Sequence, residues 1–179
     1  DSSTSRGLGD VYKRQVWHRE YCDMRIISGK NRGKKIIIPK NLPVRPTTDQ
    51  SKEAVFNIIH NSYYFEDLNV LDLFSGSGNI SYEFASRGVK NIRCVDNNSN
   101  CTMFINKISN ELNFNLKVTK NSTLKYLTSC LEQFDIIFFD PPYVFKIDEY
   151  FKIINLIFER NLLNKNGVII AEHSKKLNL

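Results

Sequence analysis

Apolar residues divide most of the chain into short continuous runs that alternate with stretches of helical period. The runs predict five strands, at 70–74 (VLDLF), 92–96 (IRCVD), 116–119 (LKVT), 135–140 (DIIFFD) and 167–172 (GVIIAE). The amphipathic stretches predict helices over 79–87, 98–112, 122–131 and 148–160. Such alternation implies right-handed crossovers and a parallel sheet with helices on both faces. The predicted fold class is therefore α/β, a doubly wound, Rossmann-like sheet with the strand order 3-2-1-4-5.

Two further apolar runs, RIIS and KKIIIP, flank the turn GKNRG near the start of the chain. They predict a small β-hairpin, because Gly29 and Gly33 supply the permissive backbone that a tight turn needs. After an extended, proline-containing segment, Thr48 or Asp49 can cap a helix over 49–61. A hairpin and one helix are thus expected to precede the sheet.

Residues 1–23 show neither a helical nor an alternating period. The string SRGLGDVYKRQ within them resembles translated sequencing-adapter remnants, so we expect a non-native, disordered extension with the natural start at Met24. Three parts are therefore expected: this extension, a hairpin and linker over 24–48, and a main domain over 49–179.

Composition and charge narrow the function classes. The chain has 179 residues with 41% hydrophobic content, which suits one domain, and no run of about 18 apolar residues that could cross a membrane. Its four cysteines show no zinc-site spacing, which favours a reducing, cytoplasmic setting. The net charge of +6 is concentrated in residues 24–52, where eight basic residues face only Asp49. Such a segment suits a polyanion such as RNA, although charge alone is equally compatible with a solvated hairpin.

The first main strand runs into a glycine turn and then a helix, in the sequence DLFSGSGN that begins at Asp72. This arrangement brings a nucleotide-like ligand close to the backbone at a helix N-terminus. Ser81 replaces the third glycine of a dinucleotide loop, and Asp72 would repel a pyrophosphate but attract a cation. S-adenosylmethionine (SAM), which carries an ammonium and a sulfonium group, meets that requirement. Asp96, at the end of the second strand, can accept hydrogen bonds from both ribose hydroxyls.

The fourth main strand ends in the tetrad Asp140-Pro141-Pro142-Tyr143. Consecutive prolines remove two backbone donors, which leaves the Asp140 carboxylate and the Pro141 carbonyl as acceptors for an external donor. Tyr143 offers a flat face on which a base can stack. Because the first and fourth strands are neighbours in the expected order, Gly76 and Asp140 should open into one crevice. The pattern favours methyl transfer to the exocyclic amine of a base; in the alternative, the prolines only end the strand and Tyr143 packs in the core.

Four segments in this order and spacing, RIISGKNRGKKI, RPTTDQSKEAVFN, DLFSGSG and DPPY, resemble the RsmD family of 16S ribosomal RNA (guanine-N2) methyltransferases. The resemblance covers residues 24–179. It implies a class I SAM-dependent enzyme that acts on the N2 amine of a guanine in the 16S rRNA of the assembling 30S subunit. Apart from the resemblance, we expect a monomer. It also implies that the chain ends before the last antiparallel strand pair of such a sheet, so we expect a C-terminal truncation.

The resemblance further implies roles for single residues. The tetrad would line the target-base site, and Arg45, Thr47 and Asp49 would shape the mouth between hairpin and crevice. Asn121 and Ser122 would lie near the adenine, although they lack the acid often found there.

The full predicted SAM site consists of Asp72, Phe74, Ser75, Gly76, Ser77, Gly78, Asp96, Asn97, Asn121 and Ser122. The predicted catalytic group consists of Asp140, Pro141, Pro142 and Tyr143. The predicted RNA contacts are Lys30, Arg32, Lys34, Lys35, Arg45, Thr47 and Asp49. No metal site is expected, since no other Cys or His stands at ligand spacing from His18, His60 or His173 in the sequence.

Three other functions stay open on the sequence alone. A DNA adenine-N6 or cytosine-N4 amino-methyltransferase shares the chemistry but would need a target-recognition domain, and the sequence shows none. A nicotinamide-dependent oxidoreductase is disfavoured by Asp72 and the missing third glycine. A non-catalytic RNA-binding module would bind RNA without an activity for Asp140→Ala to abolish.

Overall fold

A computed structural model describes residues 21–44, 47–142 and 144–173. Its central sheet has five parallel strands in the order β5-β4-β3-β6-β7. The strands are β3 (Asn69–Leu73), β4 (Asn91–Asp96), β5 (Leu116–Lys120), β6 (Phe134–Phe139) and β7 (Leu163–Ala171). In sequence terms this is the predicted order 3-2-1-4-5, so the prediction of a doubly wound sheet is confirmed.

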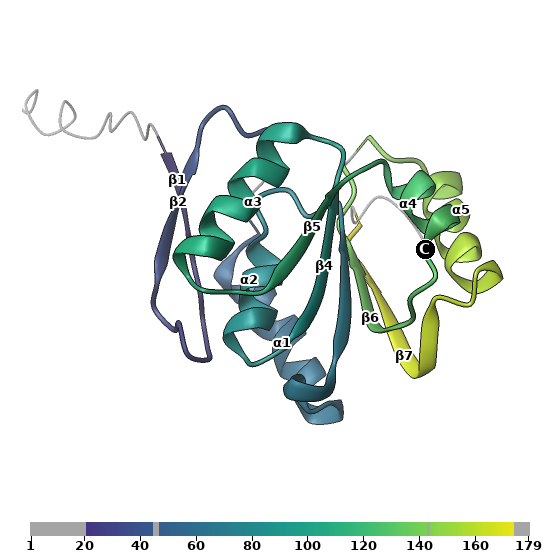
Figure 1. The fold of residues 1–179 in the computed structure, drawn as a ribbon, viewed down its shortest axis with the longest axis horizontal. Coiled ribbons are helices and arrows are strands. Elements are labelled where there is room, and N and C mark those ends of the chain that lie inside the picture. The colour runs from purple at the N-terminus through teal and green to yellow at the C-terminus, as the bar shows by residue number, and fades with distance from the viewer. Residues whose placement is uncertain (1–20, 45–46, 143, 174–179) are drawn as a thin grey trace, which may run out of the picture.

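Helices cover both faces of this sheet (Figure 1). Three pack on one face, α1 (Asp49–Ser62), α2 (Asn79–Ser86) and α3 (Ser99–Glu111), and two on the other, α4 (Thr123–Ser129) and α5 (Ile147–Glu159). Each begins and ends within two residues of its predicted bounds, while the short 3-10 turn η2 (Phe65–Asp67) was not predicted. In the described part of the chain, no helix combines the length and apolar composition that a membrane crossing requires.

Alternating side chains of the central strands pack into two separate hydrophobic cores. Val70, in β3, packs into the core that α1, α2 and α3 share, whereas its neighbour Leu71 packs into the core beneath α4 and α5. Successive side chains of a strand point to opposite faces, so a strand covered on both faces must be apolar at nearly every position. Burial on both faces therefore explains the continuous apolar runs of the sequence.

The last strand, β7, begins at Leu163, four residues before the predicted start at Gly167. Phe134 pairs with Leu163, but Ile136 pairs with Val168, which leaves an irregularity in the ladder. The polar residues 164–166 lie inside this irregularity, where they need not follow the strand period. The sequence pattern consequently showed only the second half of the strand.

The N-terminal hairpin consists of β1 (Tyr21–Arg25) and β2 (Lys35–Pro39) and forms a separate antiparallel sheet. Its existence was predicted, but its first strand was placed wrongly at residues 25–28. The amides of Ile27 and Ser28 donate hydrogen bonds to the Glu83 side chain of α2 and so do not extend the ladder. The strand β2 pairs instead with Tyr21–Arg25, which precede the predicted strand. The expectation that 1–23 is a disordered extension is therefore wrong for residues 21–23, and residues 1–20 lie outside the described part.

Candidate active site

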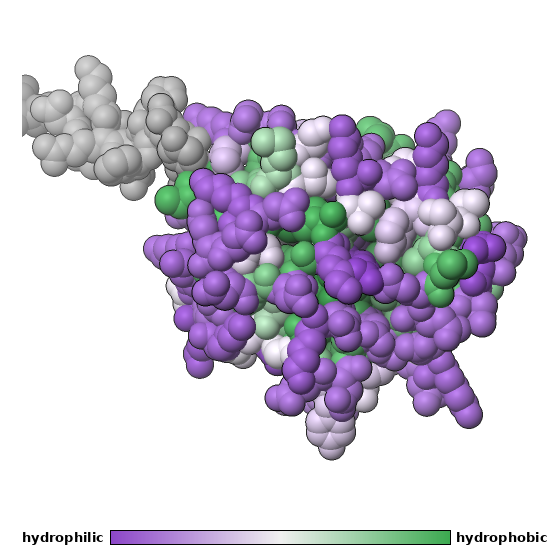
Figure 2. Space-filling model, viewed as in Figure 1, coloured by the Kyte–Doolittle hydropathy of each residue, from purple (hydrophilic) through white to green (hydrophobic). Residues whose placement is uncertain are grey.

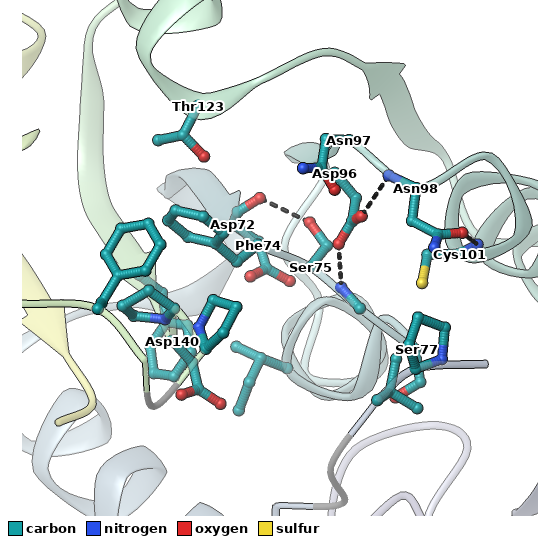
Figure 3. Close-up of a pocket in the computed structure, with 18 of the residues that line it drawn as sticks. Asp72, Phe74, Ser75, Ser77, Asp96, Asn97, Asn98, Cys101, Thr123 and Asp140 are labelled. Atoms are coloured by element: carbon teal, nitrogen blue, oxygen red, sulfur yellow. Dashed lines mark hydrogen bonds between the residues drawn. The ribbon is translucent and has the colours of Figure 1, made fainter. Parts of the chain in front are cut away.

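A crevice of about 840 Å³ opens at the carboxyl ends of β3, β4 and β6, within the usual range of small-molecule sites. Figure 3 shows side chains from these strand ends around it. Its walls include eight residues of the predicted SAM site, Asp72, Phe74, Ser75, Gly76, Ser77, Asp96, Asn97 and Ser122. They also include Thr47 and the described residues of the tetrad, Asp140, Pro141 and Pro142. The fold thus brings the glycine turn and the tetrad to one crevice.

The glycine turn is held in a strained backbone conformation by internal hydrogen bonds. Phe74 adopts a φ of 59°, which is costly for an aromatic residue, and Gly78 has a φ of 79° at the start of α2. The Ser75 hydroxyl donates to the Asp72 carbonyl at 2.7 Å and accepts from the Val95 amide at 2.9 Å. A Cβ on Gly78 would lie 2.7 Å from the Cζ atom of Tyr82, so only glycine fits there. Ser75 therefore fixes the shape of the turn, and Gly78 permits its close packing.

Asp72 is a buried carboxylate on the wall of the crevice. The Ser81 hydroxyl donates to its Oδ2 atom at 2.5 Å. Burial raises the pKa of Asp72 to about 7; the Ser81 hydrogen bond limits this rise, while the charges of Asp96 and Asp140 add to it. Ser81, which replaces the third glycine of a dinucleotide loop, is thus the partner of this acid. A cation in the crevice would favour the ionised form of Asp72.

Asp96 connects the glycine turn to the start of α3. Its Oδ2 atom accepts from the Gly76 amide and its Oδ1 atom from the Asn98 amide, each at 2.8 Å (Figure 3). A carboxylate oxygen can accept more than one hydrogen bond, so both atoms keep capacity toward the crevice. The Asn98 side chain caps α3, and it lines the crevice together with Cys101, whose pKa is raised by burial to about 11. Both residues were missed, although an asparagine before a helix is a recognisable cap signal.

The opposite wall comes from β6 and α5. The Phe145 amide donates to the Pro142 carbonyl at 2.9 Å. The centroid of the Phe145 ring lies 5.2 Å from that of the Phe74 ring, edge to face. Glu149 and Lys152 of α5 complete this wall. These contributions were missed because an amphipathic helix reveals its buried face but not the site that its exposed residues border.

Charge in the crevice is predominantly negative. Among its described lining residues, four carboxylates (Asp72, Asp96, Asp140 and Glu149) face one lysine, Lys152. A pyrophosphate would be repelled by this set, whereas a ligand with positive groups would be attracted. The residues present therefore fit SAM and disfavour a dinucleotide.

The hairpin is attached to α2 through a buried glutamate, which the sequence analysis did not identify. Glu83 is fully buried and accepts the amides of Ile27 at 2.8 Å and Ser28 at 3.0 Å. Its carboxylate also forms ion pairs with Arg87 at 2.9 Å and with buried Lys52 at 3.6 Å. A buried carboxylate needs this many partners, and losing them would leave an uncompensated charge. Glu83 therefore fixes the hairpin to the helix that follows the glycine turn.

Lys52 extends this cluster to the start of α2. Its ammonium donates to the Asn79 side chain at 2.8 Å and to the Arg25 carbonyl at 2.5 Å. Burial lowers the pKa of Lys52, and the negative charge of Glu83 limits that decrease. One buried cluster thus connects the hairpin, α1 and the helix of the glycine turn.

The other predicted residues lie away from the crevice wall. Gly78 caps α2, and the Asn121 side chain accepts from the Ser122 amide at 2.9 Å. Asp49 forms an ion pair with Arg25 at 2.9 Å, between α1 and the hairpin. Four predicted RNA contacts lie exposed on the hairpin, Lys30, Arg32, Lys34 and Lys35. Two predicted residues, Arg45 and Tyr143, lie outside the described residues.

Comparisons with known proteins identify the family of this chain. Residues 24–179 match the family model described as Conserved hypothetical protein 95. A curated relative named ribosomal RNA small subunit methyltransferase D, from Buchnera aphidicola subsp. Baizongia pistaciae, is 34% identical over 87% of this chain and 78% of its own length. The relative of the same name from Haemophilus influenzae is 32% identical, over 86% of this chain and 80% of its own length.

Two solved structures share the fold. The yhhF protein of Escherichia coli has a TM-score of 0.75 and 27% identity, covering 88% of this chain and 86% of its own. A Pyrococcus abyssi tRNA (uracil-54, C5)-methyltransferase in complex with S-adenosyl-L-homocysteine has a TM-score of 0.62 at 18% identity, covering 89% of this chain and 36% of its own. With the family model and curated relatives matched over most of its length, the chain belongs to the Conserved hypothetical protein 95 family, the RsmD family that its motifs predicted.

Proposed function

We propose that the protein is a SAM-dependent methyltransferase that acts on the N2 amine of a guanine in 16S ribosomal RNA. The observation that carries the proposal is the single acidic crevice that joins the glycine turn of β3 to the tetrad of β6. The names of the curated relatives support a small-subunit rRNA substrate. We further propose that the protein acts as a monomer, in the cytoplasm, on the assembling 30S subunit.

In this proposal the crevice holds SAM through its acids. Asp72 receives the ammonium group and Asp96 the ribose hydroxyls, while Ser122 and Asn121 lie toward the adenine. The turn residues Phe74, Ser75, Gly76, Ser77, Gly78 and Asn97 shape the rest of the cofactor site. SAM supplies an electrophilic methyl group next to the tetrad. Because the protein dipoles and charges are already in place before binding, they stabilise a cation without a further reorganisation step.

The tetrad orients the acceptor amine. The lone pair of a guanine amine is delocalised into the ring, which makes the amine a poor nucleophile. When its two N–H groups donate hydrogen bonds to the Asp140 carboxylate and the Pro141 carbonyl, the pyramidal form with a localised lone pair is favoured. The rigid Pro141-Pro142 turn fixes these acceptors, and Tyr143 stacks on the base. Positioning of this kind supplies most of the expected rate enhancement.

The Asp140 side chain provides the test. We expect Asp140→Ala to reduce the rate of methyl transfer to small ribosomal subunits roughly 100- to 1,000-fold, the usual effect of removing one transition-state hydrogen bond. Asp140→Asn should retain part of the activity because its amide oxygen still accepts one hydrogen bond. Tritiated-methyl incorporation measures the rate, and calorimetry measures the affinity for SAM, which should stay within a few-fold of wild type. Equal activity of wild type and Asp140→Ala would refute the proposed role.

A further inference from the structure

A second groove, of about 820 Å³, lies between β2 of the hairpin and α3. Leu42, a buried residue, lines both this groove and the crevice, so the two hollows are neighbours on either side of it. The remaining lining residues are Lys34, Lys35, Ile36, Ile37, Pro39 and Asn41 from the hairpin side and Asn100, Met103, Phe104, Lys107, Ile108, Glu111 and Leu112 from α3. The groove is thus bordered by the hairpin on one side and by α3 on the other.

The charge in this groove is opposite to that of the crevice. Lys34 and Lys35 project from the hairpin side, and Lys107 projects from α3. Glu111 is its one acidic lining residue among those described, and Glu111 already lies 3.8 Å from Lys107 as an exposed ion pair. Three lysines along a groove suit a chain of phosphates, whose attraction is strong and non-specific.

The groove also offers apolar surface. Ile37 and Met103 are 58% and 68% exposed, although both are large hydrophobic residues. Figure 2 shows hydrophobic surface among hydrophilic side chains over the region of α3 and β5. Asn41 and Asn100 add amide groups that can bond base edges. Lysines beside exposed apolar side chains can contact the phosphates and the unstacked bases of a single strand together.

We propose that the groove between β2 and α3 binds the single-stranded RNA segment that flanks the target nucleotide. This inference rests on the proposed function, and it adds a second wall to the RNA site. The hairpin lysines supply one side, as the sequence predicted, and α3 supplies the other through Lys107 and Met103. Because the groove and the crevice are adjacent at Leu42, one strand can lie in the groove while its target base enters the crevice. The strong negative charge of the crevice keeps phosphates outside it, whereas the groove attracts them.

Lys107→Ala tests the electrostatic part of this inference. Each phosphate contact to a single strand contributes about 0.7 to the slope of log affinity against log salt, so losing one contact should weaken binding about fivefold at 0.1 M salt. We expect the KM for undermethylated small ribosomal subunits to rise by that factor, with kcat and SAM affinity unchanged. The salt slope should fall by about 0.7. Lys165→Ala is the matched control, because Lys165 is an exposed lysine of β7, the edge strand at the other side of the sheet from β5.

Met103→Ala tests the apolar part. Its side chain is exposed on α3, so the substitution should leave thermal stability within about 1 kcal/mol while raising the KM for the subunit severalfold. Wild-type methyl transfer combined with unchanged KM values for both the Lys107 and Met103 variants would overturn the groove assignment alone. A loss of affinity in the Lys107 variant without a change in its salt slope would indicate a protein occupant and would also overturn it. Wild-type protein that binds SAM but methylates no RNA would instead refute the proposed function.

Discussion

Asp72 connects the stability of the protein to its affinity for SAM. Its carboxyl is buried, and its pKa is raised from 3.8 to about 7 in the folded protein. Between these values the folded state keeps a proton that the unfolded state has lost, so the free energy of unfolding falls as the pH rises through this window. From pH 5 to pH 7 the decrease amounts to about 3 kcal/mol, since each unit of pH corresponds to about 1.4 kcal/mol.

Asp72→Asn removes this charge while its amide oxygen can still accept the Ser81 hydroxyl. We therefore follow the free energy of unfolding of the variant minus that of wild type. This difference should rise by about 3 kcal/mol from pH 5 to pH 8. For a domain of this size this corresponds to a relative Tm change of roughly 6–12 °C. Thermal unfolding of the SAM-free protein across this pH range measures the difference. Asp67→Asn, at an exposed position of η2, is the control and should show a much smaller change.

SAM binding should respond in the opposite direction. Because the proposed site pairs the ammonium group of SAM with the ionised carboxyl of Asp72, wild-type affinity should increase as the pH rises through about 7 and binding should release a proton. Calorimetry in buffers of different ionisation enthalpy measures that proton. The Asn variant should bind SAM more weakly, without this pH dependence. A variant that loses stability relative to wild type as the pH rises, or that keeps the wild-type pH profile for SAM, would refute the role of Asp72.

Two predictions concern the hairpin. A Cβ on Gly29 would lie 1.9 Å from the Ser86 carbonyl oxygen of α2, whereas Gly33 has nothing within 4 Å and a similar φ. Gly29→Ala should therefore displace the hairpin and raise the KM for the RNA substrate at least tenfold. Gly33→Ala is the control and should cost only about 1–2 kcal/mol of backbone strain. Equal KM values for the two variants would contradict this prediction. Charge reversal at three exposed positions, Lys30, Arg32 and Lys34, should weaken substrate binding most at low salt while SAM affinity stays constant, as filter binding and calorimetry can measure.

The sequence was sufficient for features that depend on local patterns. The strand order followed from the alternation of elements, and the convergence of Gly76 and Asp140 followed from that order. Each rests on residues close together in sequence or on a general rule of parallel sheets. The main errors, at β1 and β7, arose where backbone groups bond outside their own ladder or where a bulge interrupts the strand period.

The cluster around Glu83 could not be predicted in the same way. Glu83 and Arg87 are spaced four residues apart, which in a sequence indicates an exposed helical ion pair. Their burial depends on Lys52 and on two amides of the hairpin, which are separated from Glu83 by 31 to 56 positions. The groove beside α3 was missed for a related reason, because Lys107 and Met103 belong to the polar-looking face of an amphipathic helix. Such sites exist only once distant elements pack together.

The identity of the methylated nucleoside is the most direct test of the account. Small ribosomal subunits that lack the modification are incubated with the protein and SAM, and the digested RNA is analysed by liquid chromatography and mass spectrometry. The account predicts N2-methylguanosine at one position, absent with Asp140→Ala. Methylated adenosine or cytidine, or RNA without any added methyl group, would contradict it.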